Sequence, residues 1–305
     1  MKALSKLKIG LALGGGGARG AAHIGVLKVL HNNNVIPDVI GGTSAGALIG
    51  AMYAATQDPE WIDKRFKEFL NSDAYKEMGV DRLQSDQNPE SVIGQVTKFV
   101  QNKLVFAMAL TRTSIINKDR LTKAFDYLIP VKTFEELMIP LNVYATDLQS
   151  GETICYSSGD LIDAVTQSGS IPGFVEPTDQ GDKLIVDAGV SAPLPVCELK
   201  DKANLIIGVD ISRGAPKEPM KKINIIEIIT RADRITSQYY TNLLANRSDF
   251  LIRPDVLGLH WSAFNKYDIL VENGVNAAKD RIVKLKHLIK YRKSLRYRLF
   301  HLSSN

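Results

Sequence analysis

The sequence predicts an α/β protein in which helices flank a mostly parallel sheet. Two observations indicate this class. Short apolar runs, typical of strands buried on both faces, alternate with helix-like segments along the chain. In addition, three motifs rich in glycine or ending in an acid directly follow such runs, at the carboxyl ends of the expected strands. Ligand sites of open parallel sheets form at the edge where the strands end.

The first element expected is a strand at residues 7–13. A glycine loop follows it and leads into a helix at 21–30. A second strand at 36–41 ends in a sharp turn before a small-residue helix at 47–55. The span 58–133 has helical patterns, at 61–70 and 118–128, and no convincing strand. We expect it to be a helical insertion that shapes the substrate pocket. Its most apolar part, 104–110, is interpreted as a core helix rather than a lipid-contacting flap.

Alternation resumes in the second half. Strands are expected at residues 140–145, 153–156, 183–186 and 205–209, and helices at 161–167 and 223–244. The uncharged stretch 39–56 is long enough to suggest a membrane span. It contains several glycines and the sharp turn, so a buried strand and helix is the better interpretation, and no transmembrane segment is expected. Residues 9–13 run straight into the glycine loop and are interpreted as a strand, not a signal peptide.

Composition is that of an ordinary globular protein. Of 305 residues, 45% are apolar and 23% are charged, so nothing prevents a sizeable core. The two cysteines, Cys155 and Cys197, provide neither a disulfide framework nor a metal-ligand pattern. We expect no metal and no cofactor, and a cytoplasmic location with peripheral contact at the inner face of the membrane.

The most informative motif is the pentapeptide Gly42-Thr43-Ser44-Ala45-Gly46, between the second strand and the helix that follows. A G-x-S-x-G turn in this setting holds a serine on a strained elbow with its Oγ exposed above the sheet. The glycines are needed because side chains there would clash as strand and helix crowd together. Ser44 is therefore the candidate nucleophile.

A serine hydroxyl needs a neighbouring base, which is usually a histidine. None of the five histidines follows an obvious strand end, and only His260 lies in a turn-like region late in the chain. Asp187 does follow a strand, so a Ser44–Asp187 dyad is the more economical hypothesis. The alternative is that Asp187 merely begins a turn, as aspartate near glycine often does.

The glycine loop, residues 14–20, could supply an oxyanion hole. Consecutive glycines let several amides turn toward one point, and the next helix adds the positive end of its dipole. Arg19 could reinforce that field or be simply solvated. The loop also fits a dinucleotide-binding pattern, Gly15-x-Gly17-x-x-Gly20, with Asp38 at about the distance expected for the acid of that pattern. In nucleotide-binding folds this acid ends the second strand, whereas Asp38 precedes the last residues of the second strand here. The pattern therefore favours nucleotide binding less than an oxyanion hole.

Together these motifs resemble the bacterial patatin-like phospholipases, which are relatives of the catalytic domain of neuropathy target esterase. The likeness covers roughly residues 6–281 and rests on the glycine loop, the elbow, and the segments 145–148, 168–173 and 187–195. It implies a three-layer α/β/α patatin-like fold and an enzyme that cleaves acyl esters of phospholipids or lysophospholipids through an acyl-enzyme. It also implies that Ser44 is the nucleophile, Asp187 the base, and the oxyanion hole Gly15, Gly16 and Gly17 with Arg19. Ala188 departs from the glycine usual in the family.

The C-terminal segment 279–305 holds nine lysines or arginines and one acid, so the rest of the chain is slightly acidic. We expect a hydrolase domain at 1–278 followed by a basic amphipathic helix. That helix either lies on an anionic membrane or docks on the domain with its charges solvated. Nucleic acid is not an expected partner, because no recognition motif accompanies the charge. An acyltransferase, whose base would be His260, and a catalytically silent lipid- or nucleotide-binding module are the alternative functions.

Overall fold

The computed structural model describes residues 7–79, 114, 116–214, 219–220 and 223–294. Its centre is an eight-stranded sheet in the order β5-β6-β3-β2-β1-β7-β8, with β4 also paired to β3. Pairs among β8, β7, β1, β2 and β3 are parallel, and β4, β5 and β6 join antiparallel. The strands are β1 Ile9–Leu13, β2 Val39–Thr43, β3 Leu141–Asp147, β4 Thr153–Tyr156, β5 Thr178–Asp179, β6 Leu184–Asp187, β7 Leu205–Val209 and β8 Phe250–Ile252.

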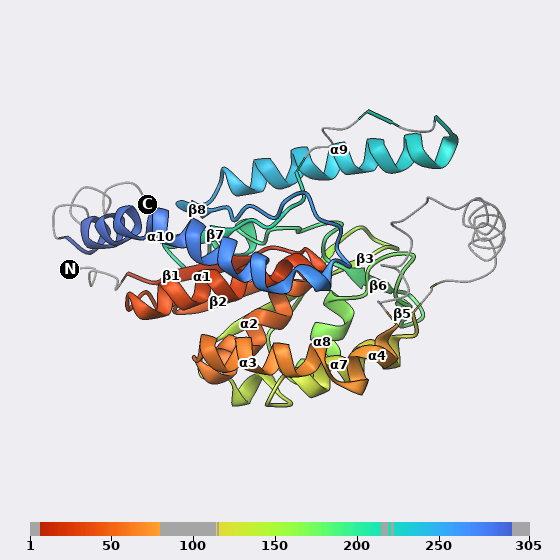
Figure 1. Cartoon of the computed structure of the whole chain (residues 1–305), viewed down its shortest axis with the longest axis horizontal. Helices are drawn as coiled ribbons and strands as arrows, with labels where there is room; N and C mark the ends of the chain where they lie inside the picture. The colour runs from red at the N-terminus through yellow and green to blue at the C-terminus, as the bar shows by residue number, and fades with distance from the viewer. Residues whose placement is uncertain (1–6, 80–113, 115, 215–218, 221–222, 295–305) are drawn as a thin grey trace.

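The helices fill the connections between the strands, as the alternation predicts (Figure 1). They are α1 Ala21–Asn32, α2 Ala45–Thr56, α3 Pro59–Leu70, α4 Asp73–Met78, α7 Lys118–Leu128, α8 Leu161–Ser168, α9 Ile225–Ala245 and α10 Tyr267–Lys293. Short 3-10 turns lie at Gly17–Gly20, Phe134–Glu136, Cys197–Leu199 and Phe264–Lys266. Among the described residues, no helix is both long enough and apolar enough to span a membrane.

The two faces of the sheet are covered differently. One face packs against α1, α2, α8 and α10 in the main hydrophobic core. The other is covered by the segment 194–203 and by the C-terminal end of α9, in a smaller core that includes Leu199 and Leu244. In Figure 1, α9 lies along one side of the molecule, and α2, α3, α7 and α8 lie on the opposite side.

The mostly parallel α/β class is confirmed, and the membrane-length stretch 39–56 is indeed a strand followed by a helix. Two short strands, β5 and β8, were not expected from the sequence. The expected insertion contributes α3, α4 and α7. Its most apolar part, 104–110, lies outside the described residues.

The basic C-terminal helix begins earlier than expected, and its described part packs on the rest of the chain. α10 begins at Tyr267 and passes residue 278 without a break. Its buried face, which includes Ile282 and Leu285, joins the main core, and the helix packs along α1. The described part therefore fits the docked alternative. A membrane contact by the rest of the tail stays a prediction, since residues 295–305 lie outside the described part.

Candidate active site

Ser44 occupies a strained elbow between β2 and α2. Its backbone has φ 55° and ψ −122°, a conformation that side chains rarely adopt. The turn is tight because a Cβ on Gly46 would lie 2.2 Å from the carbonyl oxygen of Leu13. The Ser44 amide donates a hydrogen bond of 2.9 Å to Ser168 Oγ at the end of α8, which holds the elbow from the other side.

Asp187, the last residue of β6, lies next to Ser44. The pairing of β6 with β3 brings the end of this strand to the same region as the elbow. The Gly189 amide donates to Asp187 Oδ1, at 2.6 Å. Burial raises the pKa of Asp187 from 3.8 to about 6, and the neighbouring Ser44 side chain and the Gly189 amide oppose the rise.

Ala188, which stands where the family usually has glycine, does not strain the backbone. It is buried and does not have a positive φ. Its methyl group is accommodated in the core without the conformation that only glycine tolerates. The Asp187 turn is instead completed by the amide of Gly189 and by an Asp187 amide that donates to the Ser170 carbonyl oxygen, at 2.9 Å.

The glycine loop approaches the elbow closely. A Cβ on Gly15 would lie 3.3 Å from Ser44 Cβ, so the backbone of the loop passes directly over the serine. Gly17 has φ 56°, and a Cβ there would lie 2.5 Å from the Trp261 carbonyl oxygen. That oxygen accepts a 2.7 Å hydrogen bond from the Ala18 amide. The loop that contains Trp261, which we call the 261 loop, therefore shapes the turn at Gly17.

Two of the four expected oxyanion-hole residues have other partners. The Gly15 amide donates to the Pro193 carbonyl oxygen at 3.0 Å, so it is already engaged. The Arg19 side chain donates to the carbonyl oxygens of Ile211 and Leu259, which ties the loop to two distant segments. In this structure these donors support the loop, and their part in the oxyanion hole stays a prediction. Within the described residues, the amides of Gly16 and Gly17 donate to no protein acceptor.

Charge around Arg19 comes mainly from other arginines. The pKa of Arg19 is lowered to about 10, first by burial and then by repulsion from Arg213 and Arg234, while Asp210 opposes the fall. At neutral pH the guanidinium therefore stays protonated.

His23 supports the loop from within α1. It is fully buried, which lowers its pKa to about 4 and keeps the ring neutral. Its Nε2 lies 2.8 Å from the Gly14 carbonyl oxygen. Because a carbonyl can only accept, Nε2 carries the proton and donates. Sequence position alone placed His23 on a helix and gave no sign of this role.

His260 is not joined to the dyad. Its Nδ1 pairs with Ser262 Oγ at 2.8 Å, and no hydrogen bond in the described part of the chain links it to Ser44 or Asp187.

Asp38 does not take the place that the nucleotide-binding pattern gives to its acid. Its carboxyl accepts from the amide of Ile9, the first residue of β1, and the glycine loop follows the other end of that strand.

An apolar cavity of about 90 Å³ opens beside Ser44. The helical insertion provides much of its wall, as expected, and the 261 loop closes another side. Its lining includes Leu48, Phe66, Leu121, Phe125, Trp261 and Phe264. Such a lining suits a hydrocarbon chain and offers no charged partner. Among the described residues, no group of three or more His, Cys, Asp or Glu side chains could hold a metal ion.

The comparisons with known proteins identify the family. Residues 11–199 match the model of the patatin-like phospholipase family, and because this is more than half of the chain, the chain belongs to that family. It is 27% identical over 242 residues to an uncharacterised NTE family protein of Mycobacterium bovis, a match that covers 77% of this chain and 58% of the relative.

A second relative is named lysophospholipase NTE1, from Debaryomyces hansenii. The chain is 26% identical to it over 223 residues, which cover 71% of this chain and 12% of the relative. The chain therefore spans only part of the length of the curated relatives it matches. The crystal structure of VipD from Legionella pneumophila aligns with 90% of this chain and 66% of its own, at 19% identity and a TM-score of 0.49.

Proposed function

We propose that this protein is a lipid acyl hydrolase of the phospholipase A or lysophospholipase type that uses a Ser44–Asp187 dyad. The observation that carries the proposal is the pairing of a strained, nearly buried serine with a buried carboxyl of raised pKa, at the mouth of an apolar cavity. The family membership and the lysophospholipase relative support a carboxylic ester of a lipid as the substrate class.

In the first half-reaction, Asp187 takes the proton of the Ser44 hydroxyl as Oγ forms a bond to the ester carbonyl carbon. The carbonyl electrons move onto oxygen, and the amides of Gly16 and Gly17 stabilise that anion. The anion then collapses and breaks the bond to the alcohol, which leaves with the proton from Asp187. The acyl group is now an ester of Ser44.

In the second half-reaction, water attacks this ester while Asp187 takes its proton. A second tetrahedral anion forms at the same donors and releases the fatty acid as the proton returns to Ser44 Oγ. The cavity lined by Leu121 and Phe125 holds the acyl chain during both steps. Its apolar walls exclude water from the chain and strengthen the hydrogen bonds at the reacting carbonyl.

Covalent labelling tests the nucleophile. A fluorophosphonate should add one phosphonyl group to the full chain, detected by intact mass, and peptide mapping should find it on Ser44. Ser44→Ala should abolish labelling, and Asp187→Asn should slow it. Ser237→Ala removes an exposed serine on α9 and should label normally. Full labelling of the Ser44→Ala variant would remove Ser44 from the mechanism and would favour a silent module at this site.

Product analysis tests the reaction type. Mass spectrometry of a mixed phospholipid and lysophospholipid pool should show free fatty acid in amounts equal to the lipid deacylated. An acyltransferase would instead place the acyl group on an added alcohol or thiol and release less fatty acid. His260→Ala should keep the hydrolase activity, and loss of activity there without loss of folding would support the transferase alternative.

A further inference from the structure

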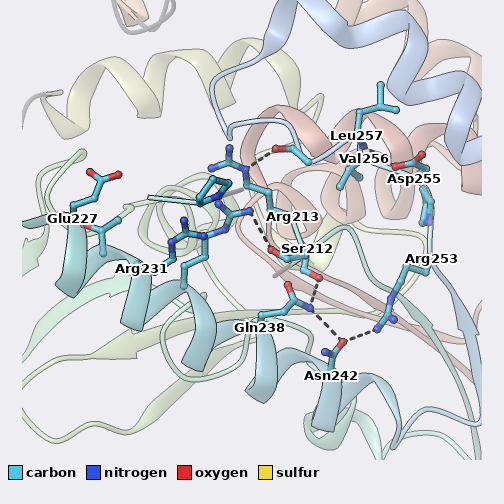
Figure 2. Close-up of a pocket in the computed structure, with 16 residues that line it drawn as sticks. Ser212, Arg213, Glu227, Arg231, Gln238, Asn242, Arg253, Asp255, Val256 and Leu257 are labelled. Atoms are coloured by element: carbon cyan, nitrogen blue, oxygen red, sulfur yellow. Dashed lines mark hydrogen bonds between the residues drawn. The ribbon is translucent and has the colours of Figure 1, made fainter. Parts of the chain in front are cut away.

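A pocket of about 1030 Å³ lies away from Ser44, between α9 and the loops that follow β7 and β8 (Figure 2). Arg231 and Arg234 on α9, Arg213 after β7 and Arg253 after β8 all line it, against two acids, Glu227 and Asp255. We call it the arginine pocket. Four arginines against two acids give the lining an excess of positive charge, which favours an anionic ligand.

Two arginines of this pocket, Arg253 and Arg213, have different partners. Arg253 pairs with Asp210 at 2.7 Å. Arg213 donates to the Gly258 carbonyl oxygen, a bond drawn in Figure 2, and in the described ranges it forms no ion pair with an acid. The pKa of the nearby Arg19 is lowered first by burial and then by the charges of Arg213 and Arg234, so both arginines repel the Arg19 guanidinium.

Before its C-terminal end, where Leu244 packs in the smaller core, α9 is amphipathic with its faces reversed relative to an ordinary surface helix. The side that carries Glu227, Arg231, Gln238 and Asn242 faces the domain and lines the pocket (Figure 2). Large apolar side chains point to solvent instead, and four of them gather at the N-terminal end, which we call the isoleucine patch. It consists of Ile223, Ile225, Ile228 and Ile229, which are 82%, 77%, 49% and 63% exposed.

The isoleucine patch lies at the end of α9 that is nearer to the active edge of the sheet. The helix runs back from there and ends at Ala245, just before β8 begins. Along its length α9 is tied to the loops beside the site. Tyr240 Oη donates to the Ser191 carbonyl oxygen in the loop after Asp187, at 2.8 Å, and Gln238 donates to Ser212 Oγ.

We propose that α9 and the arginine pocket form a docking surface for an anionic phospholipid bilayer. The isoleucine patch enters the acyl boundary of the bilayer, as interfacial helices do, and the pocket beside it takes the phosphate of a headgroup. Charge complementarity selects this occupant, because an anionic bilayer brings the opposite charge, whereas a second copy of this chain brings equal positive charge. The surface is independent of catalysis, so binding is measurable in the absence of turnover.

The test is co-sedimentation of the full chain with vesicles of phosphatidylcholine alone and of phosphatidylcholine mixed with phosphatidylglycerol. The expected result is binding to the mixed vesicles that weakens as salt rises. The double variant Ile225→Ser with Ile229→Ser should bind at least about tenfold more weakly, because two apolar side chains no longer enter the bilayer. Arg213→Gln should weaken binding about fivefold at low salt, and Arg213→Lys should restore it.

Matched controls separate the surface from general effects. Val283→Ser replaces an apolar side chain on α10 that is 61% exposed, and Arg120→Gln removes an exposed arginine from α7. Both should bind like the unaltered chain. A chain that ends at Ser294 tests the basic tail separately and should keep its binding. Circular dichroism should show that every variant is folded.

Four results would overturn the proposal. One is equal binding of the isoleucine double variant and the unaltered chain. A second is binding that does not depend on phosphatidylglycerol, and a third is binding that is lost entirely with residues 295–305. The fourth is a dimer by light scattering that the isoleucine double variant converts to monomer, which would assign the patch to a second copy. If Ser44→Ala binds vesicles normally but hydrolyses nothing, docking and catalysis are separated.

Discussion

At the scale of single residues, the proposed chemistry depends on the protonation of Asp187. Its carboxyl must be ionised to accept the Ser44 proton, and burial raises its pKa to about 6. We therefore expect kcat/KM to fall about tenfold for each pH unit below that value. Asp187→Asn should lower kcat/KM by about 10²–10⁴ at pH 8. Asp182→Asn, on an exposed loop, is the control and should leave the profile unchanged. A profile flat from pH 5 to pH 8 would contradict the assignment.

The ionised carboxyl of Asp187, which the proposed reaction needs, should also lower the stability of the folded protein. Folding raises the pKa of Asp187, so its ionisation destabilises the folded state as pH rises from 3.8 to about 6. That rise corresponds to about 3 kcal/mol at higher pH. Asp187→Asn should thus increase the free energy of unfolding in urea at pH 8 by up to this amount. This gain in stability should disappear as pH falls below 3.8, the ordinary pKa of the carboxyl. An Asp187→Asn variant that is less stable than the unaltered chain at pH 8 would argue against the raised pKa.

Residue identities predicted the centre of the site better than its supports. The elbow and Asp187 were found because each lies at the end of a strand. The sequence did not show that β6 runs antiparallel to β3, so Asp187 comes to the elbow through the register of that pair, in which it stands opposite Ala145, and not through a shared carboxyl edge. Ser168 begins one of the segments on which the family likeness rests. Its role as acceptor for the Ser44 amide could not be predicted, because the contact spans 124 residues of sequence. The engagement of the Gly15 amide by Pro193 depends on a loop whose path the sequence does not reveal.

At the scale of elements, the glycine loop is held in place by the 261 loop. Gly17→Ala would combine a positive φ with a Cβ 2.5 Å from the Trp261 carbonyl oxygen. We expect this variant to lose about 10²–10³ in kcat, as when an oxyanion donor is removed. Gly181→Ala is the matched control, because φ is also positive there and nothing lies within 4 Å of the added Cβ.

Steady-state kinetics with a chromogenic acyl ester would measure both variants. Gly181→Ala should cost about 1–2 kcal/mol of stability from backbone strain and leave kcat unchanged. Equal kcat for the two variants would mean that the position of the glycine loop does not matter for the reaction.

Elements with a strong pattern were predicted well, and short ones were not. β4, β7 and α7 have the expected bounds. β5 has two residues and β8 three, too few to show a period, and both form because neighbouring strands offer hydrogen-bonding edges. The reversed polarity of α9 could not be read from its sequence, since periodicity locates an apolar face without saying whether it is covered.

At the scale of the whole molecule, α10 completes the core and is not an appendage. α1 and α10 approach so closely that a Cβ on Gly274 would lie 2.1 Å from the Ala22 carbonyl oxygen. Leu285, beyond the expected domain boundary at 278, is fully buried. Leu285→Ala should therefore lower the free energy of unfolding by about 2–5 kcal/mol. Val283→Ala, two residues away and exposed, should change it by less than about 0.5 kcal/mol.

Urea denaturation followed by circular dichroism compares the two variants. An equal, small effect of both would show that α10 beyond residue 278 is dispensable, as a separate tail would be. A chain that ends at Ala278 should unfold at a markedly lower urea concentration, because it loses the buried Ile282 as well as Leu285.

The most direct test of the proposed mechanism is a crystal structure of the full chain after reaction with an alkyl fluorophosphonate. The account predicts phosphorus bonded to Ser44 Oγ, its oxygen within hydrogen-bond distance of the Gly16 and Gly17 amides, and the alkyl chain in the cavity beside Phe125. An adduct on another residue, or a phosphonyl oxygen turned away from the glycine loop, would contradict it.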